Sequence, residues 1–155
     1  MTQERAPFPR AETVPSYAEI SRGLTDFLAE TGNPPREGFP KGKQWSEYDY
    51  HADQLVLHPW VSPKLRATIL IEEAVRRCER LESEQRSAGA DAVEEDDEGI
   101  FWYEGDGAAW RPELIGSTVA HRLGMTTEPP DDDVLETGEE AAVVRIIGAV
   151  FRKGA

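Results

Sequence analysis

The sequence predicts a mainly α-helical protein: a single small domain of four to five helices, with a short β-hairpin near residues 100–110. Two observations lead to this prediction. Apolar residues recur three and four positions apart in several segments, as they do on one face of a helix. Serine, proline and glycine stand where these segments begin and end. An α+β fold is the alternative, because β-branched residues dominate 143–151 and would suit a strand.

The first predicted helix comes after an irregular arm, residues 1–15, which contains three prolines. Ser16 and Glu19 have the spacing of a capping box, in which each side chain accepts a hydrogen bond from the other residue's backbone. Apolar residues then recur at helical spacing up to Gly32, which we expect to end the helix in the left-handed conformation. The helical domain is predicted to span 16–155.

The next two predicted helices are bounded by prolines. Residues 33–44 contain three prolines and two glycines and are predicted to form a loop. The aromatic-rich segment 46–58 is predicted to be a helix that ends at Pro59. A longer helix over 63–87 should begin at Ser62, because a serine followed by a proline is a strong helix start.

The 63–87 helix has apolar residues on two faces of its first half. Leu65 and Ile69 lie opposite the main apolar face, so this half should sit between layers or offer a surface to a partner. Cys78 lies on the main face and is predicted to be a core residue, not a nucleophile. The main face consists of Ala67, Leu70, Ile71, Ala74, Cys78 and Leu81. Glutamates placed four residues before arginines predict three ion pairs: Glu72–Arg76, Glu73–Arg77 and Glu82–Arg86.

The hairpin is predicted from a run of four bulky apolar residues, 100–103. The segment EGDG at 104–107 is a good turn, so the chain should return towards Trp110. Side chains alternate along a strand, so the run cannot all face one core. The strand is therefore either covered on both faces within the fold or in contact with a partner. The candidate interface residues are Phe101, Trp102, Tyr103, Trp110, Leu65 and Ile69.

Two shorter helices complete the prediction. A proline opens a helix over 112–123, with Gly124 as its cap and Met125 making an apolar contact after the cap. The last helix should begin with a capping box formed by Thr137 and Glu140. It should continue through the apolar, β-branched segment for which a strand is the alternative.

The net charge of −13 is concentrated in two short segments. Residues 91–98 hold six acids and 128–140 hold seven, without a base in either, and the remaining 17 acids match the 17 bases. Such dense like charge favours solvated chain, so 88–98 and 126–137 are predicted to be acidic linkers. A field of this sign repels nucleic-acid phosphates, and no nucleic-acid partner is predicted.

One motif points to DNA, but the residues after it contradict that function. Residues 117–126, STVAHRLGMT, resemble the first helix and turn of a helix-turn-helix. The resemblance implies that the next helix would enter the major groove with basic or polar side chains. The next segment is TEPPDDDVLE, with two prolines and three aspartates. A DNA-binding regulator is therefore the third of the functional hypotheses.

His51, Asp53 and His58 are the densest group of candidate metal ligands. On the predicted helix the two histidines share a face but lie about 10 Å apart along the axis, too far to bind one ion at about 2.1 Å. His121 is the only other histidine. Neither acidic segment matches the ligand spacing of a calcium loop. The sequence therefore predicts neither a metal nor another cofactor.

The function predicted from these observations is a non-enzymatic, acidic protein-interaction protein: an adaptor, or a subunit of a larger assembly such as a viral or phage particle. Its partner would be another protein or a second copy. The alternative is a small enzyme whose site assembles around His51 and His58. No stretch approaches 18 apolar residues and the N-terminus lacks a secretory signal, so no membrane partner and a cytoplasmic or virion-associated location are predicted.

Overall fold

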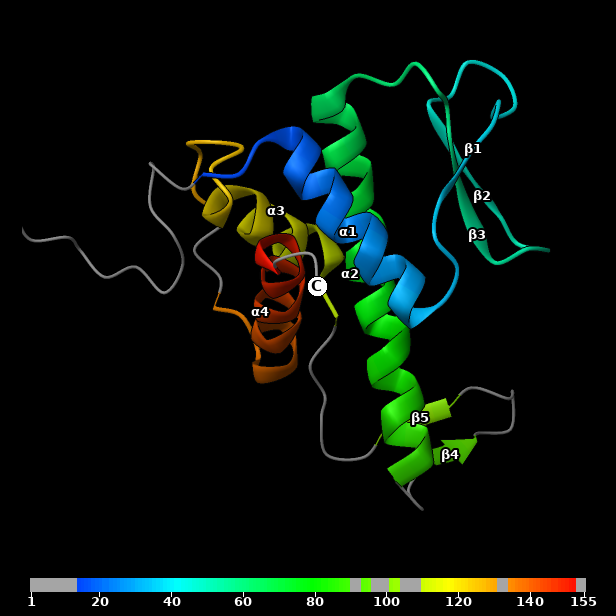
Figure 1. Ribbon diagram of the computed structural model, residues 1–155. Coiled ribbons are helices and arrows are strands. Elements are labelled where there is room, and N and C mark those ends of the chain that lie inside the picture. Colours follow the sequence, from blue (N-terminus) through cyan, green and yellow to red (C-terminus); the bar gives the residue numbers. More distant parts are fainter. Residues whose placement is uncertain (1–13, 90–92, 96–100, 104–109, 131–133, 153–155) are drawn as a thin grey trace, which may run out of the picture.

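Four helices and five short strands form the described part of the computed structural model, which comprises residues 14–89, 93–95, 101–103, 110–130 and 134–152. The helices are α1 Tyr17–Thr31, α2 Pro63–Gly89, α3 Pro112–Arg122 and α4 Thr137–Phe151. A three-stranded sheet contains β1 Arg36–Glu37, β2 Ser46–Asp49 and β3 Gln54–Leu57, and a separate pair contains β4 Val93–Glu95 and β5 Phe101–Tyr103. The predicted mainly α fold of a small domain is confirmed, with a small sheet added (Figure 1).

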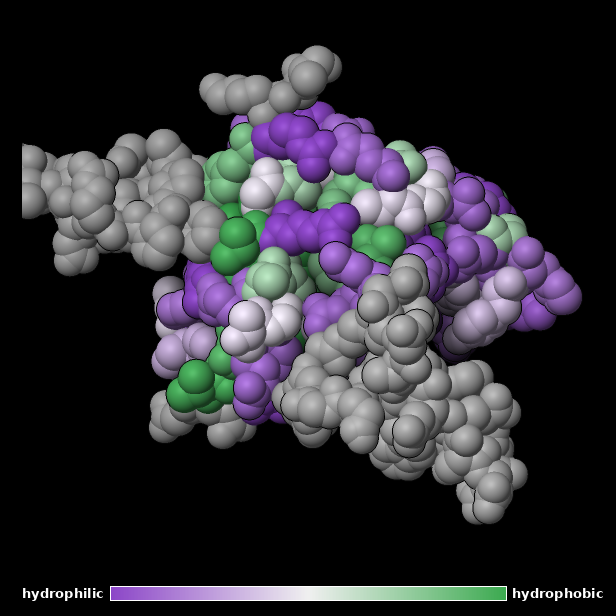
Figure 2. All heavy atoms as spheres, turned by 90° about the horizontal axis from the view of Figure 1, so that it is seen from below, coloured by the Kyte–Doolittle hydropathy of each residue, from purple (hydrophilic) through white to green (hydrophobic). Residues whose placement is uncertain are grey.

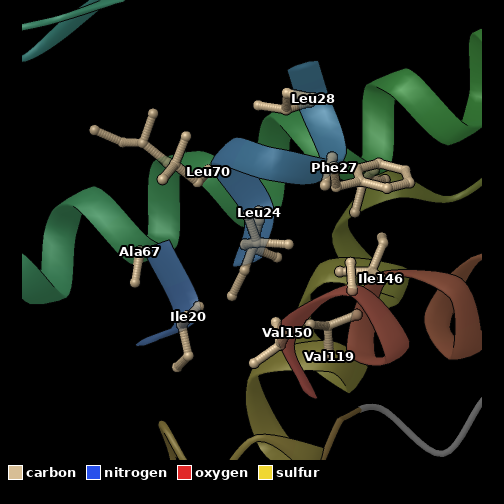
Figure 3. Packing of buried hydrophobic residues seen from close by; sticks show 14 of the residues in the cluster. Ile20, Leu24, Phe27, Leu28, Ala67, Leu70, Val119, Ile146 and Val150 are labelled. Carbon is tan, nitrogen blue, oxygen red and sulfur yellow. The ribbon is translucent and has the colours of Figure 1, made fainter. Parts of the chain in front are cut away.

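The helices pack around one aliphatic core. α1 lies against α2 and α4, and α3 lies against the same two helices (Figure 1). Figure 3 shows side chains from all four helices converging, with Leu24 of α1 between Leu70 of α2 and Ile146 of α4. Hydrophilic residues dominate the described part of the face in Figure 2, and the hydrophobic residues there form small, separate groups. Most residues of the core cluster come from the four helices.

Helix α1 begins as predicted and ends differently. The capping box is confirmed, with the Ser16 amide 2.8 Å from Glu19 Oε1 and the Glu19 amide 3.1 Å from Ser16 Oγ. Gly32 has φ 165°, which is extended backbone, so the predicted left-handed cap is wrong. Arg77 of α2 takes that place: its Nη1 donates to the Leu28 carbonyl at 2.8 Å. The carbonyl group at the end of this helix therefore receives its hydrogen bond from a side chain that is distant in the sequence.

The α1–α4 contact depends on one small residue. A Cβ at Gly23 would lie 2.7 Å from both the Ala149 carbonyl oxygen and the Val150 Cα. Both are backbone atoms, which cannot move aside without shifting α4. Glycine at this position therefore allows the two helices to approach closely.

Helix α2 confirms the predicted start and core face. The Leu65 amide donates to Ser62 Oγ at 3.3 Å, and Cys78 is buried in the core cluster. The predicted ion pairs are not formed as expected. Arg76 pairs with Glu73 three residues away at 3.5 Å, and Arg77 turns to the backbone of α1. The side chain of Arg86, which would complete the third predicted pair, lies outside the described residues.

The segment 46–58 is the clearest error of the sequence prediction, because it forms the β2–β3 hairpin and not a helix. Asp49 accepts hydrogen bonds from the amides of His51 and Ala52 at 3.0 and 3.1 Å. Asp53 then takes a positive φ of 51°. An aspartate that bonds the amides after it favours a turn over a continuing helix.

Helix α3 confirms its predicted cap. Gly124 has φ 79°, and the Met125 amide donates to the Ala120 carbonyl at 2.9 Å, as in a glycine cap. Met125 packs against the core as expected.

The capping box of α4 lies one residue earlier than predicted and joins Glu136 to Glu139. Glu139 is only 2 % exposed and is bound by the Arg111 Nε at 3.0 Å and the Arg111 amide at 2.9 Å. These bonds fix Glu139 at the helix start, in place of the Thr137–Glu140 pair. The segment 143–151 is helical, so the strand alternative is wrong.

The hairpin predicted near residues 100–110 has a different partner strand. β5 pairs antiparallel with β4, which falls within the predicted acidic linker 88–98, and α2 extends to Gly89 at the start of that linker. The predicted turn at 104–107 and residues 1–13 of the arm lie outside the described residues. Trp110, the expected end of the hairpin, is partly buried and packs against the core.

Candidate functional site

The three-stranded sheet has one face on the core and one face turned away from it. Leu55 and Leu57 of β3 belong to the core cluster, and Tyr48, opposite Leu55 in the register, packs against the same cluster. Side chains alternate along a strand, so His58 continues the opposite face. Trp45 joins it there, because the His58 amide donates to the Trp45 carbonyl at 2.9 Å.

Three large aromatic side chains surround His58 on this outer face. The ring centroids of Phe39, Trp45 and Trp60 lie 5.3, 5.1 and 5.5 Å from that of His58. Phe39 and Trp45 meet the imidazole edge-on, a favourable geometry for such rings. The three aromatic residues nevertheless remain 73 %, 47 % and 79 % exposed, respectively. We call these four residues the aromatic surface.

Backbone hydrogen bonds hold the aromatic surface in place without burying it. The Gly38 amide donates to the Leu57 carbonyl at 2.9 Å, which positions Phe39 beside β3. The Trp60 amide donates to His58 Nδ1 at 3.0 Å, and the Val61 amide donates to the His58 carbonyl at 3.2 Å. The rings are therefore preorganised on short loops that the sheet anchors.

Three of the chain's four lysines lie close in sequence to the aromatic surface. Lys41 and Lys43 occupy the loop between Phe39 and Trp45, and Lys64 comes four residues after Trp60. All three are exposed, and none forms an ion pair within the described part of the chain. Glu47 of β2 also reaches this loop, where its Oε1 accepts a hydrogen bond from the Lys41 amide at 3.3 Å. The three lysines outnumber this acid, so the charge near the aromatic surface is positive in a chain of net charge −13.

A second candidate site, which is concave, lies between α2 and the β2–β3 hairpin. It has a volume of about 260 Å³, and we call it the arginine pocket. Arg80 Nη1 contacts both carboxylate oxygens of Asp53 at 2.9 Å, and the Arg76 guanidinium lies over the Tyr48 ring at 5.1 Å from its centroid. The lining residues are Tyr48, Tyr50, Asp53, Glu73, Arg76, Arg77 and Arg80.

Glu73 is the most enclosed carboxyl group of the arginine pocket, at 5 % exposed. Burial raises the pKa of Glu73 above its usual value, although the nearby guanidinium groups of Arg76, Arg77 and Arg80 act in the opposite direction. Burial in the pocket therefore favours the protonated, neutral form of Glu73.

A further hollow, of about 740 Å³, lies between α2 and α3. Ile71 and Val75 line it on the α2 side, and Gly116 and Ala120 line it on the α3 side. A Cβ at Gly116 would meet nothing within 4 Å, so the groove is open at that point. The lining also contains charged side chains from both helices, namely Glu72, Arg76 and Glu113.

The structure separates the three candidate metal ligands. His51 is exposed in the turn before β3, and His58 comes directly after β3, so the strand lies between them. Asp53 is paired with Arg80. Among the residues that the structure describes, no three His, Cys, Asp or Glu side chains are grouped so that they could hold a metal ion.

The other candidate residues lie mostly inside the fold. Ile69 is 9 % exposed within the core cluster, and Leu65 and Trp110 pack against that cluster. The side chains of 101–103 lie outside the described residues, so their role as an interface stays a prediction. Burial raises the pKa of Cys78 to about 11 and keeps the thiol neutral, whereas a nucleophile needs the thiolate.

Phe39, Trp45 and Trp60 are the residues of the aromatic surface that the sequence prediction misses. The predicted helix over 46–58 would place the nearby aromatic residues in an internal layer. It gives no indication that the segment is a hairpin with one buried and one exposed face. The signal that could have revealed the hairpin is Asp49, because an aspartate that accepts hydrogen bonds from the amides after it favours a turn in the middle of the segment.

Among the described residues, no helix is both long and apolar enough to cross a membrane. Comparison of the chain with protein-family models, with curated proteins and with solved structures finds no match.

Proposed function

We propose that the protein works by binding another protein and that the aromatic surface is its docking site. The observation that carries this proposal is the set of three large rings, held by the backbone around His58 yet 47–79 % exposed. An exposed group of large apolar side chains marks an interaction site more often than a scattered one does. Tryptophan is also among the residues that most often dominate binding energy at protein interfaces.

The partner that fits this surface presents apolar side chains flanked by acidic ones. The exposed Lys41, Lys43 and Lys64 supply positive charge beside the rings. An acidic partner would be repelled by most of a chain of net charge −13 and attracted at this place. Complementary charge of this kind mainly raises the association rate and selects the orientation of docking. The protein would act as an adaptor or as a subunit of a larger assembly.

A binding comparison of two variants tests the proposal. The full-length protein captures partners from its host, and the captured protein is identified, purified and titrated against wild type, Trp60→Ala and Val134→Ala. Val134 is the control because it is 83 % exposed and lies outside the aromatic surface. We expect Trp60→Ala to weaken binding about thirtyfold, as for an interface hot spot, and Val134→Ala to leave it unchanged.

Three outcomes would count against the proposal. A partner that binds Trp60→Ala as tightly as wild type would dock elsewhere. A stable monomer in light scattering that captures nothing would leave the aromatic surface without a role. A dimer that Trp60→Ala dissociates would replace the acidic partner with a second copy of the chain.

A further inference from the structure

We propose that the arginine pocket binds a small oxyanion, a group such as phosphate, sulfate or carboxylate. Its residues are distinct from those of the aromatic surface, so the inference does not depend on the proposed function. The proposal rests on the charge of the pocket, on guanidinium donors that the protein leaves unused, and on the volume available.

The spacing along α2 builds the pocket. Residues 73, 76, 77 and 80 recur three and four apart, which places them on one face of the helix. That face meets the β2–β3 hairpin, which supplies Tyr48 from β2 and Tyr50 and Asp53 from the turn. Among the residues that line the pocket, three guanidinium groups therefore stand against two carboxylates; Glu84, outside the lining, is 66 % exposed and lies 3.9 Å from Arg80 Nε. The excess is positive, in a chain whose net charge is −13.

The three arginines differ in how many donors they have left. A guanidinium carries five N–H donors. Arg77 uses three in hydrogen bonds to α1 and the loop after it, with Leu28, Thr31 and Asn33 as acceptors. It is therefore mainly structural.

Arg80 commits its Nη1 to Asp53 and has a longer contact to Glu84, at 3.9 Å. Arg76 has a 3.5 Å ion pair with Glu73 and, within the described residues, no hydrogen bond. Its side chain is 52 % exposed, and the Tyr48 ring supports the guanidinium plane from one side. Arg76 is thus the donor best placed to reach a ligand, with Arg80 beside it.

These donors determine the chemistry of the ligand. A planar guanidinium binds two oxygens of one carboxylate, phosphate or sulfate in a bidentate arrangement, and such charge-assisted hydrogen bonds are strong. A volume of about 260 Å³ is enough for a group of this size together with a few waters. A nucleotide or a peptide would enter only through its terminal anionic group.

Glu73 gives the pocket a second distinguishing property. It faces Arg76, Arg77, Arg80 and Asp53, and burial already favours its neutral form. An anion bound beside Glu73 would favour the neutral form further, so binding should take up a proton. By linkage, affinity should rise as the pH falls.

Calorimetric titration of the full-length protein with sodium sulfate tests the inference, because sulfate keeps its charge over the whole pH range in which the protein is titrated. We expect saturable binding that Arg76→Gln weakens about tenfold. The matched control is Arg66→Gln, on the same helix, whose contact to Glu37 at 3.8 Å lies outside the pocket. Phosphate and acetate, titrated at neutral pH, show whether the pocket prefers a tetrahedral or a planar anion.

Glu73→Gln provides a test that loss of folding cannot imitate. It removes a carboxylate from the site, so it should tighten sulfate binding at neutral pH and abolish the increase in affinity at lower pH. Melting temperatures confirm that each variant is folded. An absence of saturable binding by wild type, equal weakening by Arg66→Gln and Arg76→Gln, or unchanged affinity in Glu73→Gln would each overturn the inference.

Discussion

The helices and the three-stranded sheet place their large side chains in opposite ways. Of the twelve largest fully buried side chains among the described residues, only Leu57 comes from the sheet. Conversely, four of the seven large hydrophobic residues that are exposed there lie within residues 36–60: Phe39, Trp45, Tyr50 and Trp60. Burial of apolar surface is the main stabilising term in folding. The difference indicates that stability comes chiefly from the helices, while the region around the sheet keeps large side chains exposed.

The largest expected effect is at Leu70, which is fully buried on α2. Leu70→Ala removes apolar contacts at the centre of the core and leaves a cavity, which should lower the free energy of unfolding by about 2–5 kcal/mol. Chemical denaturation followed by circular dichroism measures the change. Val144→Ala on α4, where the side chain is 47 % exposed, should cost about 0.5 kcal/mol or less. Equal losses in the two variants would contradict a core centred on the helices.

The next effect concerns the buried Arg111–Glu139 pair, which ties the start of α3 to the start of α4. Glu139→Gln removes the charge that accepts these bonds and should cost about 1.5–3 kcal/mol at neutral pH. The change is measured by chemical denaturation. Glu72→Gln, at an exposed position on α2, is the control and should change stability little.

The same pair predicts a pH dependence. Hydrogen bonds from Arg111 hold the pKa of Glu139 below its usual value in the folded protein. Its contribution is therefore complete above the unfolded-state pKa of about 4.3 and is lost as the pH falls through the lower folded pKa. Denaturation at a series of pH values should show a shallower acid loss in Glu139→Gln than in wild type. Parallel curves would assign the acid loss to other groups.

Two glycines of the helical part should respond to alanine in opposite directions. Gly124 has φ 79° and Val14 Cγ1 would lie 3.1 Å from an added Cβ, so Gly124→Ala should cost about 1–2 kcal/mol. Gly116 lies within α3 and an added Cβ meets nothing there, so Gly116→Ala should stabilise by about 0.5–1 kcal/mol. Melting temperatures of both variants check the signs. A loss at Gly116 would mean that the groove beside it is filled.

The helices could be predicted from the sequence because their signals are local. Periodic apolar residues, Ser16 with Glu19, and Gly124 lie within a few positions of the features that they determine. The end of α1 and the start of α4 depend on Arg77 and Arg111, whose partners are far along the chain. Rules based on local residue spacing cannot predict contacts between residues so far apart in the sequence.

The aromatic surface could not be predicted for a related reason. It combines Phe39, Trp45, His58 and Trp60, which only the folding of a hairpin brings together. A helix predicted over 46–58 assigns the histidines and aromatic residues of this segment to helical faces, which are not the faces that they occupy in the hairpin. Part of the arginine pocket could be predicted from the sequence, because its arginines share one face of a correctly predicted helix. Its second wall, however, comes from the same hairpin.

The smallest expected effect on stability is at Trp60, and it provides the sharpest contrast with Leu70. Trp60 is 79 % exposed, and its ring lies 5.5 Å from that of His58 between centroids. Removing the ring leaves no cavity, so Trp60→Ala should change the free energy of unfolding by about 0.5 kcal/mol or less. A loss of about 2 kcal/mol or more in denaturation would show that the ring stabilises the sheet. A near-zero change would mean that the Trp60 ring does not stabilise the fold, as expected for a side chain that serves binding.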